Sequence, residues 1–155
     1  MSNPPPIGHQ WPEQGGFYAG VIRDTKTNKQ WHLVMAASAI EGIWGNYGNE
    51  IPGEFSFTDG QANTALIRAA EPENELLKAI DELDCGHTDF YLPAQKELNL
   101  LYINLQDLCE ERAHWSSTQY SALSAWSQYF VVGYQGFNLK DDRFAARAVR
   151  RLPIE

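Results

Sequence analysis

The distribution of hydrophobic patterns predicts an α+β domain with helices in the middle of the chain and strands towards both ends. Runs of β-forming residues flank a polar turn at residues 24–29, and apolar side chains recur at steps of three and four through residues 94–109. After residue 115 alternation dominates. Because strands and helices occupy separate parts of the chain, the fold class is α+β rather than alternating α/β. At 155 residues, the chain has the size of one domain.

Composition and charge exclude some partners. With 43% hydrophobic and 21% charged residues, the chain has the composition of an ordinary globular protein. The longest apolar stretches, such as residues 33–40, are too short to cross a bilayer, so we expect no membrane insertion. Residues 1–10 lack the order of a signal peptide, and we expect the mature chain to start there. A net charge of −8 disfavours nucleic acid as a partner.

The first residues are rich in proline. Pro4, Pro5, Pro6 and Pro12 favour extended backbone and lack the N–H donor that a strand ladder needs. We therefore expect residues 1–14 to form an arm and residues 15–155 to form the domain. The arm would dock onto a larger assembly, with Trp11 adding to the surface of a neighbour.

The elements follow in order. Residues 17–22 and 30–36 predict a hairpin, and the glycine-rich residues 41–60 predict a long irregular loop. Asp59 is a suitable cap for a helix around residues 63–70. Glu73 and Glu75 favour the start of a second helix after Pro72, and a third follows Pro93 over residues 94–109. Strands are predicted at residues 125–132 and 145–152, with Gly133 and Gly136 marking a hairpin region between them.

Candidates for catalysis and metal binding are few. Cys85 and Cys109 match no zinc or redox spacing, so buried thiols are favoured, with a single disulfide left open. Cys85 and His87 form the one candidate nucleophile pair, but a helix end with Gly86 as its cap is favoured. The acidic residues between 71 and 89 fit a solvated helix face better than a calcium site. We expect no enzyme activity, cofactor or metal.

The most informative stretch is residues 115–139, which holds no charged residue but many aromatic residues among Ser, Gln and Gly. This composition is typical of antibody-like recognition surfaces, because Tyr and Trp give large contact areas at low entropic cost. Alternation along a strand buries about half of such residues, and we expect Trp115 and Trp126 in the core. The candidate ligand-binding residues are Tyr120, Tyr129, Tyr134, Gln135, Phe137, Asn138, Lys140 and Arg143.

A resemblance to a known family rests on motifs in a fixed order. These are Phe90-Tyr91-Leu92-Pro93, Glu97-Leu98, Trp115-Ser116-Ser117-Thr118 and Arg147-Ala148-Val149-Arg150. Together they resemble the Lcl C-terminal domain family in its phage and prophage version associated with tail fibres, and the match covers most of the chain. The resemblance implies a C-type lectin-like fold, with antiparallel sheets and two or three helices. It also implies a binding domain that displays its ligand contacts on the C-terminal strands and loops.

Two functional hypotheses follow. The preferred one is a non-enzymatic component of a phage tail, made in the host cytoplasm and built into the virion, that recognises a host surface protein or polysaccharide. Such an adhesin-like protein would contact phage tail or fibre proteins and form a homo-oligomer. The alternative is a small intracellular phage protein that binds and modulates a host protein through its acidic residues 71–89.

Overall fold

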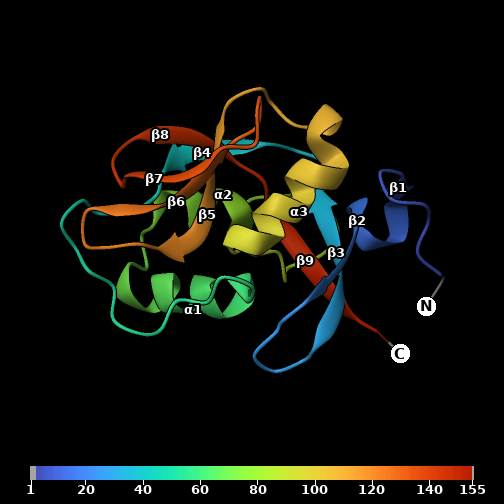
Figure 1. Ribbon diagram of the computed structural model, residues 1–155, viewed down its shortest axis with the longest axis horizontal. Helices are drawn as coiled ribbons and strands as arrows, with labels where there is room; N and C mark the ends of the chain where they lie inside the picture. The colour runs from blue at the N-terminus through green and yellow to red at the C-terminus, as the bar shows by residue number, and fades with distance from the viewer. Residues whose placement is uncertain (1–2, 155) are drawn as a thin grey trace.

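Two sheets and three helices make up the fold in the computed structural model, which describes residues 3–154 (Figure 1). The four-stranded sheet has the order β1 (Gln10–Trp11), β2 (Gly16–Arg23), β3 (Gln30–Ala36) and β9 (Val149–Pro153). The five-stranded sheet has the order β4 (Ile40–Ile43), β8 (Arg143–Ala146), β5 (Ala113–Gln119), β6 (Ser124–Tyr129) and β7 (Gln135–Leu139). The helices are α1 (Gly60–Ala70), α2 (Glu75–Asp81) and α3 (Gln95–Leu105), with short 3-10 turns at Pro12–Gln14 and Gln106–Leu108. The predicted α+β class is confirmed.

Helix α3 contacts both sheets and so joins the two halves of the domain (Figure 1). One core cluster surrounds Trp44 and Trp115, where α1 and α2 pack against the five-stranded sheet. A second surrounds Leu33, Leu98 and Phe130, where α3 packs against the four-stranded sheet. The N and C marks lie at the right of Figure 1, whereas strands β6 and β7 are labelled at the left.

Several predicted elements are confirmed. Strands β2 and β3 pair from Gly16↔Ala36 to Arg23↔Gln30, as the hairpin prediction required. Asp59 caps α1 by accepting a 3.0 Å hydrogen bond from the N–H of Ala62. The predicted third helix corresponds to α3 and the 3-10 turn that follows it to Leu108.

The C-terminal strand prediction was wrong in one respect. Residues 145–152 divide between β8 and β9, which belong to different sheets. The chain changes sheet at Arg147, whose buried guanidinium donates to the carbonyls of Ala36, Ala37 and Leu108 at 3.1, 2.9 and 2.8 Å. These contacts hold the crossing in place, because a buried guanidinium without acceptors would cost free energy. Strands β4, β5 and β7 were also not predicted.

Residues 8–14, which the sequence analysis assigned to an N-terminal arm, pack against the domain. Strand β1 pairs with β2, and the N–H of Gly8 donates to the carbonyl of Tyr18 at 2.9 Å. Trp11 is only 4% exposed and forms a cluster with Tyr18, Val34 and Leu152. The expectation that Trp11 adds to a neighbour's surface was wrong, because its own sheet offers an apolar site that removes the indole from water.

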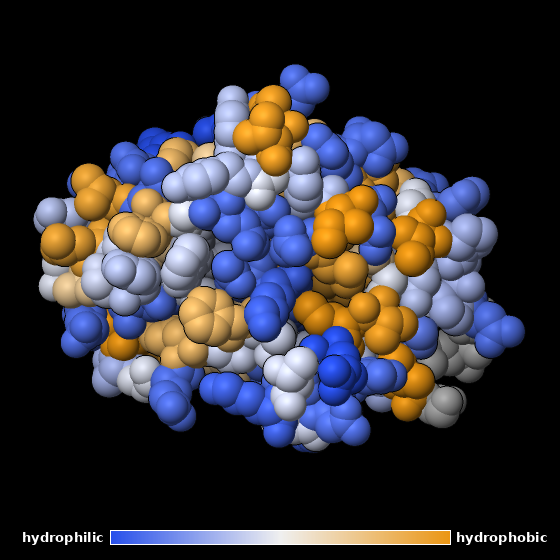
Figure 2. All heavy atoms as spheres, viewed as in Figure 1, coloured by the Kyte–Doolittle hydropathy of each residue, from blue (hydrophilic) through white to orange (hydrophobic). Residues whose placement is uncertain are grey.

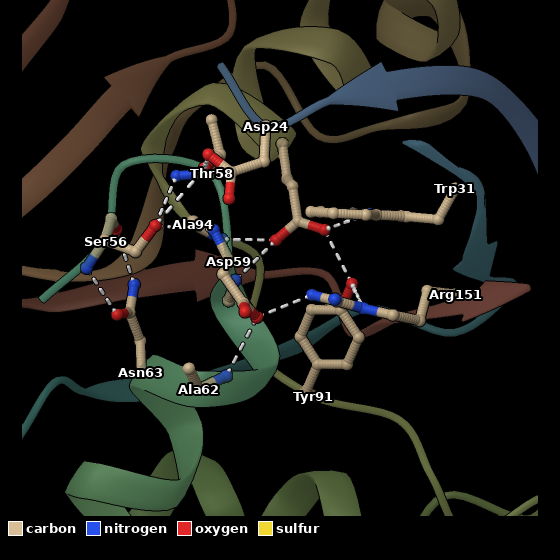
Figure 3. A network of polar contacts seen from close by, with 12 residues as sticks. Asp24, Trp31, Ser56, Thr58, Asp59, Ala62, Asn63, Tyr91, Ala94 and Arg151 are labelled. Atoms are coloured by element: carbon tan, nitrogen blue, oxygen red, sulfur yellow. Dashed lines mark hydrogen bonds and ion pairs between the residues drawn. The ribbon is translucent and has the colours of Figure 1, made fainter. Parts of the chain in front are cut away.

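A buried carboxylate, that of Glu97, joins α1, α3 and the four-stranded sheet (Figure 3). Its Oε1 accepts hydrogen bonds from the N–H groups of Gly60 and Ala94 at 2.9 and 3.0 Å. Its Oε2 accepts from the indole of Trp31 at 3.1 Å and from the hydroxyl of Tyr91 at 2.6 Å. Burial raises the pKa of Glu97, and these hydrogen bonds oppose that shift.

Arg151 completes this network. Its guanidinium lies 3.9 Å from the centre of the Trp31 ring and donates to Tyr91 at 3.3 Å and to Asp59 at 2.7 Å. Next to it, Asn63 exchanges hydrogen bonds with Ser56 at 2.8 and 2.7 Å (Figure 3). The network therefore fixes residues 56–59, the segment that enters α1.

Glu97→Gln is expected to destabilise the domain by about 1–3 kcal/mol. The glutamine amide has one acceptor oxygen where the carboxylate has two. Its NH2 group is a donor and would face other donors, either the two backbone N–H groups or the Trp31 indole. Urea unfolding followed by circular dichroism measures the loss. Glu73→Gln, on the surface, is the matched control, and equal unfolding curves for the two variants would contradict the assigned role of Glu97.

Trp11→Ala is expected to destabilise the domain by about 3–5 kcal/mol, because it empties a buried aromatic site. His9→Ala, at an exposed neighbouring position, is expected to change the urea midpoint little. If both variants unfold at the wild-type midpoint, Trp11 does not belong to the folded core.

Candidate functional site

Exposed aromatic rings gather on the five-stranded sheet, beyond the start of α3. The rings of Tyr120 and Phe137 stack with centroids 4.0 Å apart and an interplanar angle of 3°. Trp126 is nearly perpendicular to both rings with centroids 5.7 Å away, and the ring centroid of Phe57 lies 6.1 Å from that of Trp126. Tyr120, Phe137 and Phe57 remain 53%, 50% and 46% exposed. We call these residues, Phe57, Tyr120, Trp126 and Phe137, the aromatic face.

Each ring of the aromatic face is held by ordered backbone. Trp126 and Phe137 are directly opposite on β6 and β7. Tyr120 begins the turn between β5 and β6, where its N–H donates to the carbonyl of Ser124 at 3.0 Å. The carbonyl of Phe57 accepts from the N–H of Lys96 in α3 at 2.8 Å, and the Glu97 network holds the neighbouring residues. The face is therefore preformed in the unbound domain.

A shallow hollow of about 430 Å³ adjoins the aromatic face. Its lining residues are Tyr120, Ser121, Leu123, Ser124, Phe137, Asn138, Leu139 and Asp142. Figure 2 shows apolar side chains interspersed with polar ones at this end of the molecule, where Figure 1 places β6 and β7. The surface combines apolar contact area with hydrogen-bonding groups, as ligand sites do.

The turn between β6 and β7 exposes a second set of apolar side chains. Tyr129, Val131, Val132 and Tyr134 are exposed there, whereas Phe130 points inwards and stacks on His114 with centroids 4.1 Å apart. Gly133 has φ 81° and a Cβ there would lie 2.5 Å from the ring of Tyr102, so only glycine fits this turn. The packing of Phe130 and Gly133 thus directs the exposed side chains outwards.

The structure separates the predicted binding residues. Tyr120, Tyr129, Tyr134 and Phe137 are exposed as predicted, and Gln135 and Asn138 are half-buried beside them. Arg143 is exposed but lies on β8, beyond β5 and β6, and pairs with Glu75.

The sequence analysis missed Phe57, which lies in the irregular loop. It also placed Trp126 in the core, whereas Trp126 is half-exposed and Trp115 is buried.

Lys140 is a correction to the predicted set. Its side chain is fully buried, and its ammonium donates to the carbonyl of Asn49 and to Gln119 Oε1, both at 2.7 Å. The ammonium also lies 4.8 Å from the centre of the Trp44 ring. Lys140 is therefore a structural cation beneath the sheet, since a buried ammonium needs such hydrogen-bond partners to offset the loss of water.

The candidate nucleophile pair is not assembled. His87 Nε2 bonds to the carbonyl of Glu13 at 2.9 Å, and the thiol of Cys85 lies 3.9 Å from the carbonyl of His87 rather than against its ring. Cys109 is also a free thiol, which contacts Met35 Sδ at 3.6 Å, and burial raises its pKa to about 11. The polar contacts of Cys85 and His87 therefore run to backbone carbonyls rather than to each other's side chains.

The acidic segment serves the fold. Glu71 is buried and accepts hydrogen bonds from Asn46, Asn49 and Asn74. Asp81 pairs with Arg68 and Asp89 pairs with Arg150. Within residues 3–154, no three His, Cys, Asp or Glu side chains gather as metal ligands would. No helix in that range is long and apolar enough to cross a membrane.

The free energy of unfolding is expected to depend on pH through the buried His114. Its Nδ1 bonds to the carbonyl of Arg112 at 2.9 Å, and burial lowers its pKa. As the pH falls, His114 is therefore protonated in the unfolded chain at a higher pH than in the folded chain. Its contribution to stability is present above the unfolded pKa, about 6.5, and is lost as the pH falls through the folded pKa.

Urea unfolding between pH 7.5 and 5 measures this effect. His114→Asn keeps a donor for the Arg112 carbonyl without titrating, so its stability should vary less with pH than that of the wild type. His9→Asn, at an exposed position, should keep the wild-type slope. Equal slopes for wild type and His114→Asn would contradict the lowered pKa.

Comparison with known proteins gives a fold similarity. No family model and no curated protein matches the sequence, so the resemblance to the Lcl C-terminal domain family is not confirmed. A fimbrial protein from Bacteroides ovatus is similar in structure, with a TM-score of 0.59 and 15% sequence identity. The match covers 81% of this chain but only 36% of that protein, and at this identity it concerns the fold alone. This mixed α+β chain therefore has a fold similar to part of a bacterial fimbrial protein.

Proposed function

We propose that this domain is a non-enzymatic, adhesin-like binding module that recognises a component of a cell surface through its aromatic face. The exposed stack of Tyr120 on Phe137 carries the proposal. The two main core clusters do not include these rings, so both rings remain accessible for contact with a ligand. Rings that already pack together lose little freedom on binding, which leaves more of the contact energy for affinity.

The charge distribution supports this proposal. Residues 115–139 hold no charged residue although the chain has a net charge of −8. The centres of binding interfaces are depleted of charged residues and enriched in Tyr, Trp and Phe, because desolvating a charge costs more than desolvating a ring. Ser121, Ser124 and Asn138 supply hydrogen-bonding groups around the rings.

Two settings fit such a module. The fold similarity to a fimbrial protein supports a place on a surface fibre. The motif resemblance supports a second setting, a receptor-binding component of a phage tail that contacts other tail proteins and further copies of itself. In both settings the partner is a surface protein or polysaccharide. The intracellular alternative loses its main support, because Glu71, Asp81 and Asp89 are used within the domain.

The test compares a Tyr120→Ala, Phe137→Ala double variant with the wild type in binding to intact bacterial cells of several species. Loss of two central aromatic contacts is expected to cost at least about 2 kcal/mol, roughly a thirtyfold weaker Kd. Treating the cells with protease or with periodate separates protein from polysaccharide ligands.

Tyr47→Ala is the matched control, since Tyr47 is an exposed aromatic residue outside the aromatic face. All proteins must first melt at the same temperature. If the double variant binds cells as tightly as the wild type, or if only Tyr47→Ala weakens binding, recognition does not use the aromatic face.

A further inference from the structure

Strand β7 has a free edge. It lies at the end of the five-stranded sheet, and among residues 3–154 it pairs with one strand, β6. The N–H of Tyr129 donates to the carbonyl of Tyr134, and the N–H of Lys140 donates to the carbonyl of Leu123. Hydrogen bonding alternates along an antiparallel pair, so Gly136 and Asn138 bond to β6 while the N–H groups of Gln135, Phe137 and Leu139 point away from it. The carbonyl of Leu139 is already used, because it accepts from the N–H of Asp142 at 3.0 Å.

This edge lacks the features that normally prevent pairing. Natural edge strands carry charges, proline or bulges that stop another chain from adding to the sheet. Strand β7 has the sequence Gln-Gly-Phe-Asn-Leu, and its register with β6 is unbroken from Ser124↔Leu139 to Gln128↔Gln135. By contrast, the edge strand β4 contains Glu41, and the edge strand β9 contains Arg151 and Pro153.

The hollow beside the aromatic face adjoins the same edge. Phe137 and Leu139 are exposed on one side of β7 and line the hollow with Tyr120 and Leu123. Side chains of an added strand alternate between the two sides of a sheet, so one of them would enter this hollow next to Phe137. The hollow therefore lies where one apolar side chain of an added strand would be placed.

We infer that β7 accepts an extended segment of a partner protein as a further antiparallel strand of the sheet. Backbone hydrogen bonds supply affinity, and the hollow supplies selectivity for an apolar side chain. Asp141 and Asp142 follow β7, which favours a basic residue at the start of the segment. A second copy of this chain fits less well, because two chains of charge −8 repel. The inference rests on the proposed function and makes the surface ligand a protein.

The probe is the peptide acetyl-Lys-Val-Thr-Val-Thr-Val-amide at millimolar concentration, with amide hydrogen exchange measured by NMR. Exchange at Gln135, Phe137 and Leu139 is expected to slow at least tenfold on adding the peptide, with no change at Gly136 and Asn138, which are already bonded to β6. Asp142→Asn is expected to weaken peptide binding severalfold, whereas Asp84→Asn, an exposed change away from β7, leaves it unaltered.

A peptide with N-methyl groups on alternate residues is the matched control, because it keeps the side chains and loses the backbone donors. Equal binding of that peptide, or an absence of alternating protection at saturation, overturns strand addition. Protection that rises with protein concentration and no peptide makes a second copy the occupant and also overturns the inference. If the aromatic double variant loses cell binding while the peptide gives no protection, the proposed function stands and strand addition falls.

Discussion

The buried carboxylate of Glu97 is the constraint on which the domain depends. Removing a charge from water costs several kcal/mol, and only a complete set of donors offsets that cost. Here the donors come from the starts of α1 and α3 and from Trp31 and Tyr91, so satisfying one side chain fixes two helices against the four-stranded sheet. The same arrangement orders residues 56–59 and with them Phe57, which links the core to the aromatic face.

Local signals in the sequence predicted the elements that local physics determines. The periodicity of α3, the Asp59 cap and the β2–β3 hairpin each depend on residues close together in the chain. Strand β7 could not be predicted in this way, because Gln135 and Gly136 have little intrinsic preference for strands and the pairing with β6 orders them. The division of β8 from β9 depends on carbonyls that meet Arg147 only in the folded state.

The same distinction holds for the candidate site. Aromatic composition without charge identified the right region of the chain, and Tyr120 and Phe137 lie there. The alternation of residues separated the two sides of β6, but it could not show which part of the sheet α3 leaves uncovered. For this reason the half-exposed Trp126 was wrongly predicted to lie in the core. Lys140 is adjacent to β7 in sequence, yet its partners, Asn49 and Gln119, come from distant segments. A charged residue next to a predicted binding strand therefore does not by itself indicate a ligand contact, because acceptors from distant segments can hold its side chain inside the protein.

The position of the two chain ends determines how the domain can be displayed. Both are marked at the end of its longest axis away from strands β6 and β7 (Figure 1). A tether joined to either end would therefore hold the molecule from behind and present the aromatic rings outermost. Tension between such a tether and a bound ligand would run the length of the domain and load both sheets through α3. The resistance of the domain to force would then depend on the contacts of that helix as much as on the contacts with the ligand.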